Sequence, residues 1–523
     1  MSGIDSPTDR QIIDALQRRT AERLRGQSDE VVFAYIADAV YMERRRLQTD
    51  RDDATPDYEQ RLAAAARASH QSRAAQERAL LDLVAVYAAE IHNRFSEKTY
   101  SFATRVLPGA LTRLLTAAQP TQLLGADFDP TSRIVVEGPV DTLKALAKTH
   151  TLVLTPTHLS NLDSPLIGYA LHKVGLPPCI YGAGLNLFSN PAMSFFMSRL
   201  GAYTVDRRKQ LRLYKDVLKD YSIEAIGRGA HSLFFPGGTR SRSGILETDL
   251  KKGLLGTAIT AWQDGLEGKR ASPEILVVPC TLSFALVLEA ETLIEDALAA
   301  SGKARYIITD DEFSEARTVA SFARRVLNLD ASTYVRFGTP LDLMGNPVDA
   351  EGHSMDPSGA RIDRRAYVTD RSGTVIRDRQ RDRIYTARLS RQISASYFRD
   401  NIALPTHVAG FVAWNLLSAK HPRLDVFHRV MLGREDCQLP RSEMLAGIDT
   451  VLAAIKRLQQ AGRIQSALPG GAEAVLSEAL SRFGGFHKIP ALSASGDRIQ
   501  VGPKLALYYS NRLVGYGLEK ELS

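Results

Sequence analysis

Thr151-Leu-Val-Leu-Thr-Pro-Thr-His158-Leu-Ser-Asn-Leu-Asp163-Ser-Pro165 places one histidine five residues ahead of one aspartate, directly after an apolar run. The apolar run predicts a buried strand, and the polar residues after it predict the start of a helix. Side chains five residues apart in one helix point about 140° apart. A His158–Asp163 contact therefore requires the histidine in the turn and the aspartate in the first helical turn. Ser160, Asn161 and Asp163 could also serve only as helix caps.

A second unusual segment follows about seventy residues downstream, Ser232-Leu-Phe-Phe-Pro-Gly-Gly-Thr-Arg-Ser-Arg-Ser-Gly244. An apolar strand here runs into a loop of glycines, hydroxyls and two arginines. Gly237 and Gly238 allow a ligand to approach the backbone closely, and the guanidinium groups of Arg240 and Arg242 suit phosphate oxygens. The loop is therefore a candidate anion site, although an isolated Arg-Ser-Arg is usually an exposed basic turn.

The two segments together resemble the first and third signature blocks of the glycerolipid acyltransferases, which include glycerol-3-phosphate and lysophosphatidate acyltransferases. The first block, H-x-x-x-x-D, is matched by His158 and Asp163. The third block, F-P-E-G-T-R-S-R, is matched at Phe235, Pro236, Gly238, Thr239, Arg240, Ser241 and Arg242. Gly237 stands where the family normally has a glutamate.

Two further blocks of this family occur in the expected order. The second, a glycine, an apolar strand and an arginine, is matched by Gly201-Ala-Tyr-Thr-Val-Asp-Arg207-Arg208. The fourth, an apolar strand with a central proline, is matched by Ile275-Leu-Val-Val-Pro279-Cys-Thr-Leu-Ser-Phe284. Looser similarities to the larger, glycerol-3-phosphate type of enzyme are found at Ala183–Phe188, Asn401–His407 and Leu507–Leu513.

Acyl transfer from a thioester to an alcohol needs a base that accepts the hydroxyl proton, and neutral histidine is suited to this near pH 7. His158 is the candidate base, and Asp163 would orient its ring. The resemblance implies an acyl donor, acyl-CoA or acyl carrier protein, and glycerol-3-phosphate as acceptor. Candidate substrate-binding residues are Arg207, Gly238, Thr239, Arg240, Ser241 and Arg242. The resemblance also implies direct attack without an acyl-enzyme, and we expect no cofactor and no metal.

Gly237 leaves alternatives open, because glycine supplies neither a side-chain acceptor nor a charge. A water or another carboxylate could fill the gap, or the acceptor could be lysophosphatidate instead. A catalytically silent scaffold that binds lipid phosphates is the alternative from another class. Cys179, Cys280 and Cys437 are far apart in the sequence and form no C-x-x-C, so we expect small core residues.

Length and composition are those of a globular protein larger than one ordinary domain. The 523 residues are 44% hydrophobic and carry a formal net charge of +7. This slight excess fits an enzyme acting on anionic lipids, and no recognised nucleic-acid-binding module is present. No apolar run of eighteen residues and no signal peptide is found, so we expect a cytoplasmic protein with peripheral membrane contact. Leu404–Leu417 and Phe188–Leu200 are candidate contacts.

The order of elements predicts an α/β fold, a mixed sheet covered by helices, with helical N- and C-terminal regions. We expect a helical region over residues 1–110, an acyltransferase catalytic domain over 111–344, an irregular insertion over 345–380 and a helical region over 381–523. No internal repeat is apparent. The expected strands of the catalytic domain are Arg133–Glu137, Leu152–Thr155, Cys179–Tyr181, Ala202–Val205, Ser232–Phe235, Ile275–Phe284 and Tyr334–Phe337.

Overall fold

A computed structural model gives the fold of the protein. The structure describes residues 7–92, 95–100, 134–185, 194, 197–268, 274–287, 289–301, 333–484, 487 and 489–522. Most of the predicted membrane contact at Phe188–Leu200, including Phe195 and Phe196, therefore lies outside the described residues.

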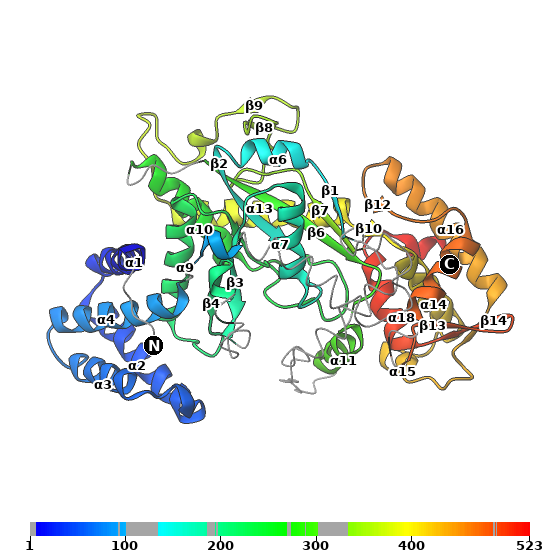
Figure 1. The fold of residues 1–523 in the computed structure, drawn as a ribbon, viewed down its shortest axis with the longest axis horizontal. Helices are drawn as coiled ribbons and strands as arrows, with labels where there is room; N and C mark the ends of the chain where they lie inside the picture. Colours follow the sequence, from blue (N-terminus) through cyan, green and yellow to red (C-terminus); the bar gives the residue numbers. More distant parts are fainter. Residues whose placement is uncertain are drawn as a thin grey trace.

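A seven-stranded mixed sheet forms the centre of the molecule (Figure 1). Its strands are β1 (Ile134–Glu137), β2 (His150–Pro156), β3 (Ile180–Gly184), β4 (Ala202–Val205), β5 (Ser232–Leu233), β6 (Glu274–Phe284) and β7 (Thr333–Phe337). Each lies at a predicted strand, which confirms the mixed α/β fold. β5 is shorter than predicted, because the chain leaves the ladder ahead of Pro236, which has no N–H to donate.

The strand order is β1-β7-β6-β2-β5-β3-β4. β2 pairs in parallel with β5 and β6, and β3 pairs in parallel with β4 and β5, so five neighbouring strands run in one direction. β7 pairs antiparallel with β6 and parallel with β1. The carboxyl ends of β2, β4 and β5 therefore meet at one edge of the sheet, where ligand sites of α/β folds gather.

Helices cover both faces of this sheet. α7 lies in front of the sheet in Figure 1 and packs against β1 and β7, whereas α13 lies behind it and packs against β6. The helices of this part are α6 (Val140–Leu146), α7 (Asp163–Val174), α9 (Arg212–Gly227), α10 (Lys252–Leu266), α11 (Ala290–Ser301) and α13 (Arg379–Asp400). β6 is buried along nearly its whole length, as expected for a strand covered on both faces.

The N-terminal region is helical and forms a core of its own with α9 and β4. Its elements are α1 (Pro7–Arg25), α2 (Asp29–Thr49), η1 (Arg51–Asp53), α3 (Pro56–Ala68) and α4 (Arg73–Ile91). Arg19 pairs with the buried Glu224, and Arg23 pairs with the buried Asp220 at 2.5 Å. These ion pairs hold α1 against α9, while the apolar faces of the other helices bury Tyr203 and Tyr214.

The region predicted as an irregular insertion contains a repeated turn, so the expectation of no internal repeat is wrong. Four five-residue turns of pattern D-x-x-G-x begin at Asp342, Asp349, Asp356 and Asp370. In each, the aspartate Oδ1 accepts hydrogen bonds from two later backbone amides, and the glycine takes a positive φ. The turns start seven or fourteen residues apart, with Asp363 capping a short 3₁₀ helix, η6 (Arg364–Tyr367), at the intervening position. β8 (Ser354–Met355) and β9 (Arg361–Ile362) pair between them.

The C-terminal region shares its core with the sheet. Its helices are α14 (Pro405–Lys420), α15 (Val426–Val430), α16 (Arg441–Gln460), α17 (Ala472–Phe483) and α18 (Pro503–Ser510), followed by η7 (Asn511–Leu513) and η8 (Leu518–Glu521). It also contains five short strands that the prediction of a helical region did not include. These are β10 (Ile402–Ala403), β11 (Gln438–Pro440), β12 (Gln465–Ser466), β13 (Leu492–Ser495) and β14 (Arg498–Val501).

The prediction that the apolar segment Leu404–Leu417 contacts a membrane is wrong. It forms most of α14, whose residues from Pro405 to Ala413 are all buried, and α16, α17 and α18 pack around it. An apolar helix enclosed by three others has no face left for lipid. Across the described residues, no helix is both long enough and apolar enough to cross a bilayer.

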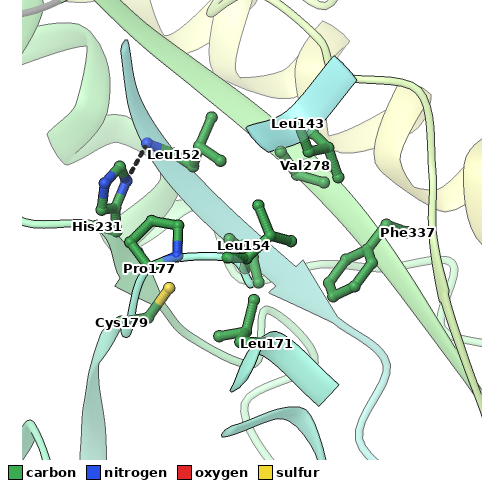
Figure 2. A pocket seen from close by; sticks show the side chains of 10 residues that line it. Leu143, Leu152, Leu154, Leu171, Pro177, Cys179, His231, Val278 and Phe337 are labelled. Carbon is green, nitrogen blue, oxygen red and sulfur yellow. Dashed lines mark hydrogen bonds between the residues drawn. The ribbon is translucent and has the colours of Figure 1, made fainter. Parts of the chain in front are cut away.

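A small cavity lies inside the apolar core between β2 and α7 (Figure 2). Its volume is about 10 Å³, and Leu152, Leu154, Leu171 and Phe337 are among its lining residues. His231 also lines it and accepts a hydrogen bond from the Leu152 backbone N–H at 3.0 Å. Burial lowers the pKa of this histidine. The cavity has room for about one water and is a packing defect rather than a substrate site.

Candidate active site

His158 and Asp163 meet at the carboxyl end of β2, as their spacing predicted. His158 lies in the turn, Asp163 is the first residue of α7, and His158 Nδ1 is 2.8 Å from Asp163 Oδ2. An ionised carboxylate can only accept, so Nδ1 carries the hydrogen in this pair and Nε2 has a free lone pair. Within the described part of the chain Nε2 makes no hydrogen bond, and the side chain keeps 16% of its exposure. The ring is thus oriented with its basic nitrogen available.

Asp163 is fully buried and is held by the turn that precedes it. Its Oδ2 also accepts hydrogen bonds from the backbone N–H groups of Leu159 at 2.6 Å and Ser160 at 3.0 Å. The aspartate therefore caps the turn and orients the histidine with one oxygen. Its backbone partners precede α7, so it holds the turn and does not cap the helix, and its part in catalysis stays a prediction.

The backbone of His158 is held on both sides by the loop between β5 and α10. Its N–H donates to Glu247 Oε1 at 2.9 Å, and its carbonyl accepts from the Ser241 N–H at 2.7 Å. Its ring stacks on Phe235, with the ring centroids 4.1 Å apart. The first and third sequence blocks thus form one hydrogen-bonded unit.

The residues of the predicted anion loop differ in their exposure and in their partners. Arg240 is half-buried and pairs with the buried Glu289 at 3.3 Å. Thr239 and Arg242 are exposed, and Arg242 makes no hydrogen bond or ion pair to any described residue. Gly238 has φ +81°, a conformation that favours glycine, and its α-carbon faces the Lys251 side chain.

Glu289 also joins the loop to the histidine turn. Its carboxylate accepts hydrogen bonds from the Ser160 hydroxyl at 3.0 Å and from the Asn161 N–H at 3.0 Å. Burial raises the pKa of this carboxyl, against the opposing effect of the Asn161 amide and Arg240. Glu289 therefore anchors Ser160 and Asn161, and the Ser160 hydroxyl also accepts a hydrogen bond from the Leu162 N–H at 3.2 Å, directly before α7.

The basic residues of the second block separate into two groups. Arg207 is exposed at the end of β4, and its side chain makes no hydrogen bond or ion pair within the described residues; no contact joins it to His158. Arg208 pairs with Asp206 and with Asp53 of the N-terminal region. Lys209 is buried, pairs with Glu90 and lies over the ring of Tyr87 at 4.9 Å. Arg208 and Lys209 therefore dock the N-terminal helices.

The two looser C-terminal similarities meet behind the site. Buried Arg512 donates from Nε to Asn401 Oδ1 at 2.8 Å and from Nη2 to the Leu282 carbonyl of β6. His407 Nε2 donates to the Phe284 carbonyl at 3.0 Å. The C-terminal region thus braces the end of β6 beside the histidine turn. Together these segments line a cavity of about 10 Å³ whose walls include Leu159, His407, Tyr508 and Arg512.

The sequence did not single out Glu247 and Glu289, which hold the histidine turn in place. Both lie in otherwise apolar surroundings, Ile245-Leu246-Glu247 and Leu286-Val-Leu-Glu289. An isolated carboxylate among apolar residues near a predicted site is the signal that could have indicated them.

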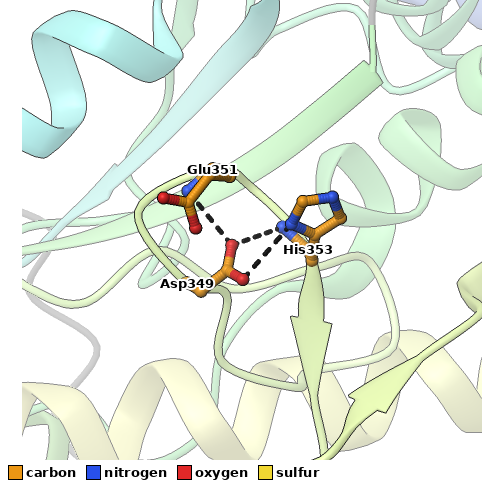
Figure 3. Close-up of side chains that lie close together, drawn as sticks. All are labelled: Asp349, Glu351 and His353. Carbon is orange, nitrogen blue, oxygen red and sulfur yellow. Dashed lines mark hydrogen bonds and ion pairs between the residues drawn. The ribbon is translucent and has the colours of Figure 1, made fainter.

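A metal-binding arrangement is suggested at one place among the described residues, and it belongs to a turn. Asp349, Glu351 and His353 bring their ligand atoms within 4.8 Å of one another (Figure 3). The aspartate accepts hydrogen bonds from the backbone N–H groups of Glu351 and His353, as in the other D-x-x-G-x turns. The three cysteines are free and buried, and burial raises the pKa of Cys179 to about 12.

Known proteins resemble the middle of this chain. Residues 137–283 match the Acyltransferase family model. A glycerol-3-phosphate acyltransferase of Glaesserella parasuis is 33% identical over 195 residues, and one of Haemophilus ducreyi is 32% identical over the same length. The matched segment is 37% of this chain and 22% of each relative, so the chain spans about a fifth of the length of these curated relatives.

A solved structure, the 1-acyl-sn-glycerophosphate (LPA) acyltransferase PlsC from Thermotoga maritima, is 16% identical. The alignment covers 61% of this chain and 86% of that chain with a TM-score of 0.25, which is too low to establish a common fold. The family match, in contrast, spans His158, Asp163 and the arginine loop. Residues 137–283 are therefore similar to an acyltransferase domain.

Proposed function

We propose that this protein transfers a fatty acyl group from acyl-CoA or acyl carrier protein to the hydroxyl of glycerol-3-phosphate, in phospholipid biosynthesis. The observation that carries the proposal is the His158–Asp163 pair, with Nδ1 bound to a buried carboxylate and Nε2 left without a partner among the described residues. The name of the curated relatives, glycerol-3-phosphate acyltransferase, supports this acceptor.

In the proposed reaction, His158 Nε2 accepts the hydroxyl proton as the alcohol oxygen attacks the thioester carbonyl. The carbon–oxygen bond forms, the carbon–sulfur bond breaks, and the departing thiolate takes the proton from the imidazolium. Asp163 stabilises that imidazolium through Nδ1–H. These reaction steps need no nucleophilic side chain, and the buried, free cysteines are compatible with direct attack.

The phosphate of the acceptor would bind at the loop of residues 238–242, with Arg207 as a further candidate. Arg242 and Arg207 are exposed, so their guanidinium groups are open to a dianion. Arg240 is already paired with Glu289 and would contribute less free charge. Its main effect would be to hold the loop in shape around the ligand.

We also propose that the protein acts in the cytoplasm at a membrane surface, because the product of the proposed reaction is a lipid. Lysophosphatidate remains the competing acceptor, because it presents the same phosphate together with one free hydroxyl.

The experiment is thiol release from acyl-CoA with each acceptor in turn, for the wild-type protein and for His158→Ala. His428→Ala is the matched control, because His428 also binds an aspartate at 2.8 Å but is exposed. We expect release that depends on glycerol-3-phosphate, is lost in His158→Ala and is unchanged in His428→Ala. Equal rates in wild type and His158→Ala would exclude His158 as the base, and release only with lysophosphatidate would change the acceptor.

A further inference from the structure

Glu247 places a carboxylate directly beside the α-carbon of Gly237. A β-carbon built on Gly237 would lie 3.1 Å from Glu247 Oε1 and 3.2 Å from Glu247 Cγ. These distances are tighter than ordinary van der Waals contact. The space that a side chain at position 237 would enter is therefore already taken by the side chain of Glu247, and the two positions cannot both carry a large residue without a shift.

The position of Glu247 is fixed by its neighbours in the loop. Leu246 and Leu250 on either side are buried in the main core, and the Glu247 carbonyl accepts a hydrogen bond from the Ser394 hydroxyl of α13 at 3.1 Å. Its Oε2 is buried and makes no hydrogen bond within the described residues. Burial raises the pKa of this carboxyl, while the His158 N–H and the charge of Arg512 act in the opposite direction. A carboxylate in such buried surroundings is stable only where hydrogen bonds or an opposite charge compensate for the lost contact with water.

The contact that Glu247 makes is with the candidate base. Its Oε1 accepts the His158 N–H at 2.9 Å, whereas Asp163 holds the ring of the same residue from the other side of the turn. Removal of Glu247 would leave the His158 amide without its acceptor and one side of the turn free to move. A displacement of about 1 Å at a reacting group is enough to lower a rate about 100-fold.

We propose that Glu247 is a positioning residue for His158, and that it supplies from ten residues downstream the carboxylate that the family motif carries at the position of Gly237. This inference rests on the proposed function for its kinetic part. It also explains the glycine, because a glutamate at 237 and a glutamate at 247 would compete for one space. The carboxylate of the motif is then moved from position 237 to position 247 and is not lost.

The test compares Glu247→Ala, Glu247→Gln, Gly237→Glu and the double variant Gly237→Glu/Glu247→Ala. Asp249→Ala is the matched control, since that carboxylate lies two residues away and its side chain is 98% exposed. We expect Glu247→Ala to lower kcat by about 100-fold with little change in acceptor KM. Glu247→Gln keeps an oxygen that can accept the amide and should keep most of the activity.

Gly237→Glu alone should lose activity through crowding, and the double variant should recover most of it. A double variant no more active than Glu247→Ala would overturn the relocation, and Glu247→Ala with wild-type kcat would overturn the positioning role. A rise in acceptor KM at constant kcat would show instead that Glu247 binds the acceptor.

Thermal unfolding of the same five variants separates this inference from the proposed function. Gly237→Glu and Glu247→Ala should each lower the unfolding midpoint, and the double variant should restore it, whether or not the wild type transfers acyl groups. Additive midpoint losses would contradict the shared space even in an active enzyme. If Glu247→Ala does not fold, the double variant still decides the question.

Discussion

Replacement of Asp163 by asparagine and by alanine should separate its two roles. Asp163 Oδ2 accepts three hydrogen bonds, from His158 Nδ1 and from the backbone N–H groups of Leu159 and Ser160. Alanine removes the acceptor and leaves two buried amides unpaired, each at a cost of about 1–3 kcal/mol, so the total is about 2–6 kcal/mol. Asparagine keeps an oxygen at the same place, and loses only the additional strength of charged acceptors, about 2 kcal/mol at most.

Activity, unlike stability, should fall to a similar extent in both variants. In Asp163→Asn the turn keeps its shape, but no negative charge stabilises the imidazolium that forms during transfer. We expect kcat to fall by about 10²–10⁴-fold in this variant, close to the loss in Asp163→Ala, although its thermal midpoint stays much nearer the wild-type value. The assay is thiol release at saturating acyl-CoA and acceptor, together with thermal unfolding of each purified protein.

Two outcomes would refute this reasoning. Wild-type kcat in Asp163→Asn would show that the charge does not act in the reaction and that Asp163 serves only as a cap. Equal midpoint losses in the asparagine and alanine variants would show that the two backbone amides do not depend on the oxygen.

Four other variants test further contacts of the structure. Arg242→Ala, at an exposed site, should raise the KM for glycerol-3-phosphate about tenfold without changing the thermal midpoint. Lys209→Met should instead lower the free energy of unfolding by about 2 kcal/mol without changing that KM, because it removes the contacts with Glu90 and the tyrosine rings. Arg512→Met should cost about 3 kcal/mol in the same unfolding assay, because it removes two hydrogen bonds to buried acceptors; an unchanged midpoint would exclude the bracing role. Burial lowers the pKa of His407 to about 3, while the unfolded chain protonates near pH 6.5, so the unfolded state binds more protons between these values and stability falls as pH drops below about 6.5; His407→Gln should show a shallower loss between pH 6.5 and pH 4, and identical slopes would contradict this.

Local patterns were sufficient to predict the seven strands of the sheet. β-branched and apolar runs such as Ile275–Phe284 can be buried on both faces only in a covered sheet, and the mixed order of strands and helices favours that architecture. The His158–Asp163 contact was also predictable, because five residues across a strand-to-helix turn bring two such side chains together. These features depend on neighbours in the sequence.

Contacts that depend on the folding of distant segments could not be predicted in the same way. Leu404–Leu417 is as apolar as a membrane-facing helix, and only the packing of three later helices shows that it is core. Glu289 reaches the histidine turn from 129 residues away. The D-x-x-G-x turns are different, because their seven-residue period is present in the sequence, in a segment that lacks the apolar periodicity from which helices and strands are predicted.

Ser241 links the two halves of the candidate site. It stands between Arg240 and Arg242 in the chain, and its N–H holds the carbonyl of His158 at 2.7 Å. Any anion that draws the arginines together therefore acts on the backbone of the base through a single hydrogen bond. Glu247, at the far end of the same loop, holds the other side of that backbone. Under the proposed function, phosphate recognition and alignment of the base would thus depend on one loop, and a glycine at position 237 would be tolerated because that loop returns a carboxylate to the same place.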